Sequence, residues 1–486
     1  MTSSLVSFIE ETTRLAAPLE KAYNLAEWNA ASLGTPEAIQ AQEKAQTAYM
    51  RFWADPKRYQ TAKELSASAN GVEPLLARQI RLIYLTAGMN QQDQATLEQI
   101  ARVEGEIRQR YFNFRAIVDG QSLSDNRIDE ILATTSDGGE ARRVWEGSKQ
   151  VGAEVADRVR KLARLRNQAA QAHGFRDHFH RSLTLSEIDE SQLLAIFDDL
   201  DRQSRRPFEQ VKSRIDQLRA DRFGVQPGDL RPWHYSNRFF QEPDQLGEID
   251  FDTLFSAHDP TTLATATYDG LGMDVRPILA RSDLYAREGK NQHAFCTHID
   301  RQGDIRTLNN LERNRRWHST LHHELGHAVY EQYLDDDLPW LLRTPPHLLS
   351  TEAVAILMGS VTMDKEWLTK ILGVPSNEAA HVAQAAHDQN RATRLVFARW
   401  CLVMTHFERG LYGNPEADLD SLWWDLAERY QLLRRPDGRQ APDWAAKIHV
   451  ALHPVYYHNY ELGDMVAAQF QASIRQHANG FVGRPA

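Results

Sequence analysis

The chain is poor in cysteine. Only Cys296 and Cys401 occur among its 486 residues, which excludes a framework of disulfide bonds and favours a reducing compartment. No apolar run approaches the roughly 20 residues that span a bilayer, and the first residues lack the basic start and apolar stretch of a secretory signal. The sequence therefore predicts a cytoplasmic protein without a membrane partner.

Basic clusters, internal repeats and low-complexity segments are also missing. The net charge of −10 is spread along the chain, and no run of lysine and arginine forms the footprint of a nucleic-acid-binding protein. The hydrophobic share of 42% is ordinary for a globular protein. We expect one domain over residues 1–486 and no nucleic-acid partner, whereas the sequence does not indicate an oligomeric state.

Most of the chain shows the apolar spacing of helices. Apolar residues recur at three- and four-residue intervals over 3–32, 36–54, 72–88, 91–118, 138–172, 190–222, 376–411 and 463–477. Two short stretches rich in strand-forming residues, 293–300 and 304–311, predict a hairpin that turns at residues 301–303. The predicted fold class is therefore mostly α, with a small β-sheet beside the helix described next.

The segment HHELGH (322–327) contains the pattern H-E-x-x-H, formed by His323, Glu324 and His327. On a helix, residues four apart project from one face, so both imidazoles can bind a single zinc ion. Glu324 is placed beside them to act as a general base on water. The pattern also arises by chance, so a third ligand is needed to complete the argument.

Glu352 is the candidate for this third ligand. It is the lone acid in LLSTEAVAILMGSV (348–361), an otherwise apolar stretch predicted to be helical. A carboxylate in such surroundings is costly unless a cation pairs with it, and zinc would supply that cation. The alternative is an acid at a helix start, with Ser350 or Thr351 as the N-cap. We favour a His-His-Glu site that holds one Zn²⁺ per chain.

Several segments together resemble a known family. They are LNNLERNRRWHSTLHHELGHAVYEQYLDDDLPWLLR (308–343), TEAVA (351–355), VWEGSKQVG (144–152), LRNQAAQAHGFRD (165–177) and KIHVALHPVYYHNY (447–460). In these segments the chain resembles the gluzincin metallopeptidases, most closely the angiotensin-converting-enzyme family of peptidyl-dipeptidases. The thimet-oligopeptidase-like family shares the zinc motif and a C-terminal His and Tyr segment, and it is the nearest competitor.

The resemblance implies a fold and an activity. The fold would be a helical, two-lobed ellipsoid with a deep central cleft, in which residues 1–120 form lid-like helices and 121–486 form the cleft and the catalytic helices. The activity would be the zinc-dependent hydrolysis of short peptides, with release of C-terminal dipeptides. The competing family implies internal cleavage instead, and a non-catalytic peptide-binding relative is a third hypothesis.

The same resemblance nominates residues near the C-terminus. Tyr460 would stabilise the oxyanion of the transition state, and His449 would assist it. This chain has one more residue between His449 and Tyr457 than the family pattern, so His453 is a possible substitute that we include among the substrate-binding residues.

Lys447 and Tyr457 match the family residues that bind the free C-terminal carboxylate of a peptide. A glutamine that joins them in the family has no clear match, and His234 or Tyr235 are possible stand-ins. The family's aspartate four residues after the third ligand is Ile356 here. The group that orients a zinc-binding histidine is therefore expected elsewhere.

Overall fold

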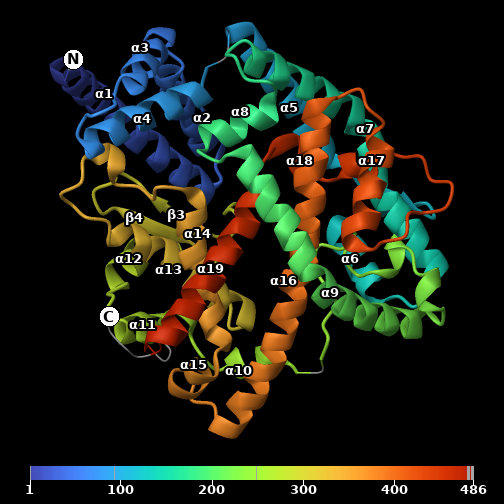
Figure 1. Cartoon of the computed structure of the whole chain (residues 1–486). Coiled ribbons are helices and arrows are strands. Elements are labelled where there is room, and N and C mark those ends of the chain that lie inside the picture. The colour runs from blue at the N-terminus through green and yellow to red at the C-terminus, as the bar shows by residue number, and fades with distance from the viewer. Residues whose placement is uncertain (1, 92, 248, 479–481, 483–486) are drawn as a thin grey trace. The chain divides into compact units, whose positions relative to one another are not determined.

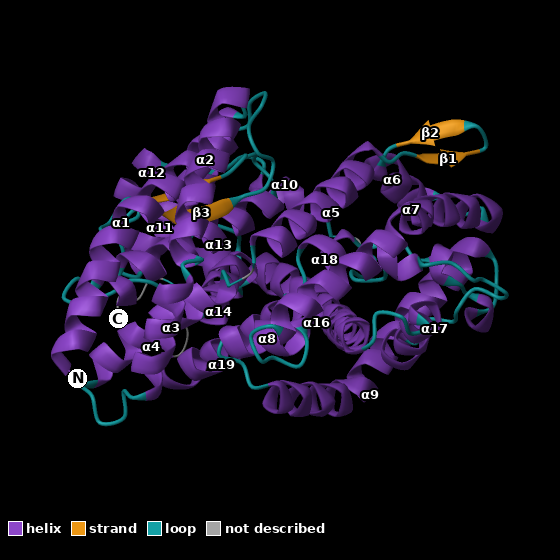
Figure 2. Ribbon diagram, turned by 90° about the horizontal axis from the view of Figure 1, so that it is seen from above, coloured by secondary structure: helices purple, strands orange, loops and turns teal. Residues whose placement is uncertain are grey.

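The computed structural model of the chain describes residues 2–91, 93–247, 249–478 and 482. Helices dominate these residues, and the strands form two short antiparallel hairpins, β1–β2 and β3–β4 (Figure 2). This confirms the predicted mostly-α fold with a small sheet. No helix in the described ranges combines the length and the apolar character needed to cross a membrane.

The chain divides into two compact units. The first comprises residues 1–91, 249–387 and 462–486, and the second comprises residues 92–248 and 388–461. Each unit is therefore built from segments that are far apart in the sequence.

The first unit contains the N-terminal helices and the predicted metal-binding helix. Its elements are α1 (Thr2–Leu33), α2 (Pro36–Trp53), α3 (Pro56–Ala67), α4 (Pro74–Met89), α10 (Phe251–Phe255), α11 (Pro260–Gly270), α12 (Arg276–Arg281), β3 (Phe295–His298), β4 (Ile305–Leu308), α13 (Arg315–Gln332), α14 (Leu348–Ser360) and α15 (Lys365–Lys370). Helices α1–α4, blue in Figure 1, pack on one another. Helices α2, α3 and α4 each begin with a proline that follows a capping side chain, the arrangement that favours a helix start.

The second unit is also helical. Its elements are α5 (Gln94–Asn113), β1 (Ala116–Val118), β2 (Gln121–Leu123), α6 (Asp125–Thr134), α7 (Gly138–Gln171), α8 (His178–Leu185), α9 (Glu190–Phe223), α17 (Leu419–Leu426) and α18 (Ile448–Leu452). Two long helices, α16 (Ser376–Gly413) and α19 (Tyr457–Ala478), contribute residues to both units.

Two predicted boundaries are wrong. The helix predicted over 91–118 ends at Asn113, and residues 116–118 form β1 instead. Asp119 and Gly120 both have positive φ, as the two-residue turn of a hairpin requires, and this turn overrides the helical pattern. The last helix begins at Tyr457 rather than at residue 463. Gly463 lies inside that helix, where its low helix propensity obscured the pattern.

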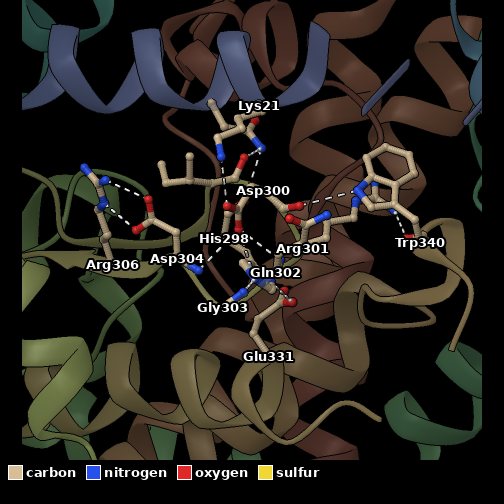
Figure 3. Close-up of polar contacts among 12 residues, drawn as sticks. Lys21, His298, Asp300, Arg301, Gln302, Gly303, Asp304, Arg306, Glu331 and Trp340 are labelled. Carbon is tan, nitrogen blue, oxygen red and sulfur yellow. Dashed lines mark hydrogen bonds and ion pairs between the residues drawn. The ribbon is translucent and has the colours of Figure 1, made fainter. Parts of the chain in front are cut away.

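The predicted hairpin turn is confirmed, and polar contacts hold it on two sides (Figure 3). On the side of α1, Lys21 pairs with Asp300 at 3.1 Å, and Arg301 donates to Glu20, also on α1, at 2.6 and 2.9 Å. On the side of α13, the Nδ1 atom of His298 lies 3.1 Å from a Glu331 oxygen. The hairpin is thereby fastened to the helix that carries the H-E-x-x-H motif.

Candidate metal centre and carboxylate cluster

The three predicted metal ligands come together in the first unit. The Nε2 atoms of His323 and His327 lie 3.6 and 3.5 Å from the two carboxylate oxygens of Glu352. All three ligand atoms lie within 4.8 Å of one another, and this is the one such group of three found among the described residues. The two histidines project from α13, and the glutamate projects from α14.

Glycines let the supporting helices approach closely. A Cβ atom on Gly326 would lie 2.8 Å from the Cα atom of Ala355, so α13 and α14 can pack this tightly only with glycine at that position. A Cβ atom on Gly463 of α19 would lie 3.1 Å from Cγ of Glu352. The glycine that obscured the helix prediction therefore makes room for the predicted metal ligand Glu352.

Thr351 orients one of the histidines. Its Oγ1 atom lies 2.8 Å from Nδ1 of His327, which leaves Nε2 of that ring directed toward Glu352. Thr351, immediately before the predicted third ligand, is thus the candidate for the orienting group that Ile356, in place of the family's aspartate, does not supply. Helix α14 is capped by His347, whose ring accepts from Leu349 N. The alternative in which Ser350 or Thr351 caps the helix is therefore wrong.

The pKa shifts of His323 and Glu352 suit metal binding. Burial lowers the pKa of His323 to about 4, against the opposing effect of the Glu352 charge. Burial also works to raise the pKa of Glu352, but the hydrogen bond from His327 and the charges of both histidines outweigh it, and the net shift is downward. A neutral imidazole and an ionised carboxylate are the forms that bind metals.

Glu324 lies beside the ligands and is 7% exposed. Burial raises its pKa to about 7; the charge of Glu352 acts in the same direction, whereas His327 acts against it. The Glu324 carboxylate also acts on Cys296 of β3. Burial is the main cause of the raised pKa of this thiol, and the charge of Glu324 raises it further. The Glu324 carboxylate is thus buried on α13 and lies near the hairpin.

The histidine that precedes the motif is structural. His322 is fully buried, and its Nδ1 atom donates to the His318 carbonyl at 2.7 Å. Its Nε2 atom lies 3.0 Å from the Thr267 hydroxyl, and Tyr268 donates to its carbonyl at 2.7 Å. These bonds fix α13 on α11.

The predicted C-terminal residues gather in the second unit. The ring of His449 lies 5.2 Å from that of Tyr457 and 5.4 Å from that of His453. The Tyr457 and Tyr460 rings, one turn apart on α19, lie 5.6 Å from each other. His453 is exposed, whereas Nδ1 of His449 is buried and has no hydrogen-bond partner within the described part of the chain.

Lys447 has a partner that the sequence did not reveal. Its ammonium donates to Oε1 of Gln241 at 2.7 Å. The two stand-ins for the missing glutamine are bound elsewhere: the Tyr235 hydroxyl lies 2.8 Å from both Lys212 and Asp216, and Nδ1 of His234 accepts from a backbone N–H. Of these three residues, Gln241 is the one whose side chain contacts Lys447.

The charge of Lys447 is poorly compensated. Its side chain is buried beside the rings of Phe239, Trp400 and Tyr457, at 5.3, 5.3 and 5.8 Å from their centroids. No carboxylate of a described residue lies within ion-pair distance of it. Burial, assisted by the charge of Arg238 and only partly opposed by the charge of Glu242, lowers its pKa to about 8. Because Gln241 is neutral, the Lys447 ammonium can still form an ion pair with an anionic group.

Comparison with known proteins divides the chain between two families. Residues 2–213 match the model described as angiotensin-converting enzyme, and residues 279–484 match the model of peptidase family M3. A curated relative, an angiotensin-converting enzyme of Theromyzon tessulatum, is 20% identical over 385 residues, which are 73% of this chain and 62% of the relative. The chain thus spans less than two thirds of that protein's length.

These matches confirm the predicted resemblance to gluzincin peptidases of both families, and they support a zinc metallopeptidase. Each family model covers less than half of the chain. The segment with the metal centre and the C-terminal cluster falls within the match to family M3.

Proposed function

We propose that the chain is a zinc-dependent peptidase that releases dipeptides from the carboxyl ends of short peptides. The observation that carries this proposal is the buried ammonium of Lys447, whose one hydrogen-bond partner among the described residues is the neutral side chain of Gln241. A buried cation without an anion is costly, and a peptide carboxylate would remove that cost.

The residues of the metal centre fit zinc. Ligand atoms of a tetrahedral site with bonds of 2.0–2.1 Å lie about 3.3–3.4 Å apart, close to the 3.5 and 3.6 Å between the histidine nitrogens and the Glu352 oxygens. His323, His327 and Glu352 would hold one ion. When bound, zinc supplies a Lewis acid that polarises the scissile carbonyl and makes water more acidic.

The chain's own residues would carry the proton transfers. Glu324 accepts a proton from the attacking water and delivers it to the leaving amine. Tyr460 and His449 donate hydrogen bonds to the developing oxyanion. Burial, together with Lys447 and His453, lowers the pKa of His449 to about 4, so its ring is a neutral N–H donor at pH 7. The exposed His453 is the weaker candidate for this role.

Recognition of the substrate carboxylate falls to three groups. The ammonium of Lys447 supplies the charge, and the side chains of Gln241 and Tyr457 supply hydrogen-bond donors. An anchor for the carboxylate fixes how far from the C-terminus the chain is cut. It also excludes peptides whose C-terminus is blocked.

Internal cleavage of short peptides is the second candidate function. It is favoured by the match of residues 279–484 to peptidase family M3, because this segment includes both the metal ligands and Lys447. An internal cut does not require the carboxylate of the substrate.

One experiment separates the two. The zinc-loaded protein is given a peptide with a free C-terminus and the same peptide as its amide, and the products are identified by mass spectrometry. We expect a C-terminal dipeptide from the free acid and cleavage of the amide that is slower by at least tenfold. Equal cleavage of both peptides at internal bonds would favour the endopeptidase, and binding of the free acid without products would favour a non-catalytic peptide-binding protein.

A further inference from the structure

The segment that presents Gln241 has no regular secondary structure. It follows a short 3-10 turn at residues 232–234, and Phe240 adopts the left-handed conformation with φ of 49°. Bulky residues rarely adopt this conformation unless their surroundings impose it. Contacts from elsewhere in the second unit must therefore hold residues 237–241, which we name the Gln241 loop.

Side chains bind the loop's consecutive backbone carbonyls. The Arg238 carbonyl accepts from Trp145 Nε1 at 3.1 Å and from Lys149 Nζ at 2.9 Å. The carbonyls of Phe239 and Phe240 both accept from Nε2 of Gln431, at 3.0 and 2.8 Å. Because these groups find no partner in a helix or a sheet, the side chains replace the usual backbone bonds.

A side chain of the loop itself accepts hydrogen bonds from two of the loop's backbone N–H groups. Oδ1 of Asn237 accepts from the N–H groups of Phe239 and Gln241, at 3.0 and 3.3 Å. Hydrogen bonds thus fix the backbone on both sides of Phe240. The next residue is Gln241, whose side chain accepts a hydrogen bond from Lys447.

Gln431 is suited to this task by its chemistry and its position. Its side chain is 1% exposed, and a carboxamide has two N–H donors, one for each carbonyl. It ends a π-helical turn, Ala427–Gln431, and is followed by Leu432 in the left-handed conformation. Such turns are uncommon and occur often at functional sites.

We propose that Gln431 is a positioning residue for substrate recognition: it fixes the Gln241 loop so that Gln241 stands beside Lys447, ready to bind a peptide carboxylate. This inference rests on the proposed function. Gln431 itself touches no substrate in this scheme, so its loss weakens carboxylate binding and leaves the chemical step intact.

The test is the variant Gln431→Glu, assayed on a peptide with a free C-terminus and on its amide. Glutamate keeps the length of the side chain but offers no N–H donor to the two carbonyls. We expect KM for the free acid to rise about tenfold with kcat within twofold of wild type, which is the signature of lost uniform binding, and we expect constants for the amide to stay unchanged. The same substitution at the exposed Gln226 is the matched control and should change neither constant.

Unchanged KM for the free acid in Gln431→Glu, or an equal loss of kcat on both peptides, would overturn the inference. In a Gln241→Ala background we expect Gln431→Glu to have no further effect on KM, and an additive increase would also overturn it. If Gln431→Glu does not fold, Asn237→Ala loosens the same loop from its other side; the same rise in KM is expected, and a wild-type KM would count against the inference.

The assay of the wild-type protein distinguishes a failure of this inference from a failure of the proposed function. Equal cleavage of acid and amide by the wild-type protein defeats the proposed function before any variant is made. A wild-type preference for the free acid that Gln431→Glu retains in full defeats only the positioning role.

Discussion

Thr351 should set the zinc affinity through a single hydrogen bond. When Nε2 of His327 binds a metal, the proton of the ring lies on Nδ1, which then donates to Thr351 Oγ1 over the 2.8 Å that separates them. Valine has the shape of threonine without the acceptor. Thr351 is 7% exposed, so water cannot readily replace the hydroxyl, and the unsatisfied N–H costs about 1–3 kcal/mol. Since about 1.4 kcal/mol is a factor of ten, Thr351→Val should weaken zinc binding by roughly 10–100-fold.

The assay is competition for zinc against a chelator of known affinity at fixed pH. Thr351→Ser keeps the acceptor and should bind zinc within about threefold of wild type. Thr362→Val is the matched control, because Thr362 is fully buried in the same unit and its hydroxyl donates to the Gly359 carbonyl rather than to a predicted ligand. Wild-type zinc affinity in Thr351→Val, or an equal loss in Thr362→Val, would refute the reasoning.

Four further outcomes follow from the structure. Glu324→Gln should keep one zinc per chain by metal analysis while kcat falls by about 10²–10⁴-fold, because the general base is lost. KM for a free-acid peptide should rise as pH passes the Lys447 pKa of about 8, since the lysine is charged only below it, and Lys447→Met should remove this step. Gly326→Ala should lower the free energy of unfolding in urea by about 1–3 kcal/mol, because the new Cβ atom meets Ala355 Cα at 2.8 Å. Burial raises the pKa of Glu408 to about 8, so its contribution to stability is full below the ordinary pKa near 4.5 and is lost as pH rises through 8. Relative to wild type, the free energy of unfolding of Glu408→Gln should therefore increase progressively from pH 5 to pH 8, by up to about 4 kcal/mol.

Each of these has a contrary result. Wild-type turnover in Glu324→Gln would remove that residue from the chemistry. A KM that does not change with pH would contradict binding of the substrate carboxylate by Lys447. The same holds if Lys161→Met, a substitution of an exposed lysine, also removes the pH step. Gly105→Ala, at a helical glycine with open space around it, should stabilise the fold by about 0.5–1 kcal/mol, and an equal gain in Gly326→Ala would contradict the close helix packing. A difference in the free energy of unfolding between Glu408→Gln and wild type that does not change with pH would mean that the carboxyl does not titrate in this range.

The grouping of the three candidate metal ligands was largely predictable because a helix converts sequence spacing into geometry. Residues 323 and 327 project from one face of α13 whatever the rest of the chain does. Glu352 was identifiable because a lone acid in an apolar helix needs a cation. The details that complete the centre depend on how helices pack: Thr351 meets His327 only because Gly326 lets α14 approach α13 so closely. The spacing of apolar residues in the sequence does not predict how closely α14 packs on α13.

The partner of Lys447 shows why the other site was harder to predict. Gln241 precedes it by 206 residues, and nothing in the local pattern distinguishes this glutamine from others nearby. Tyr235 was one of the two stand-ins considered, but its hydroxyl is bound to Lys212 and Asp216 on α9. Gln241 directly follows Phe240, which adopts the left-handed conformation, and a phenylalanine is among the last residues for which that conformation would be predicted. The position of Gln241 is therefore a property of the tertiary contacts around the loop, so the residues that make those contacts are the ones whose substitution should change carboxylate recognition.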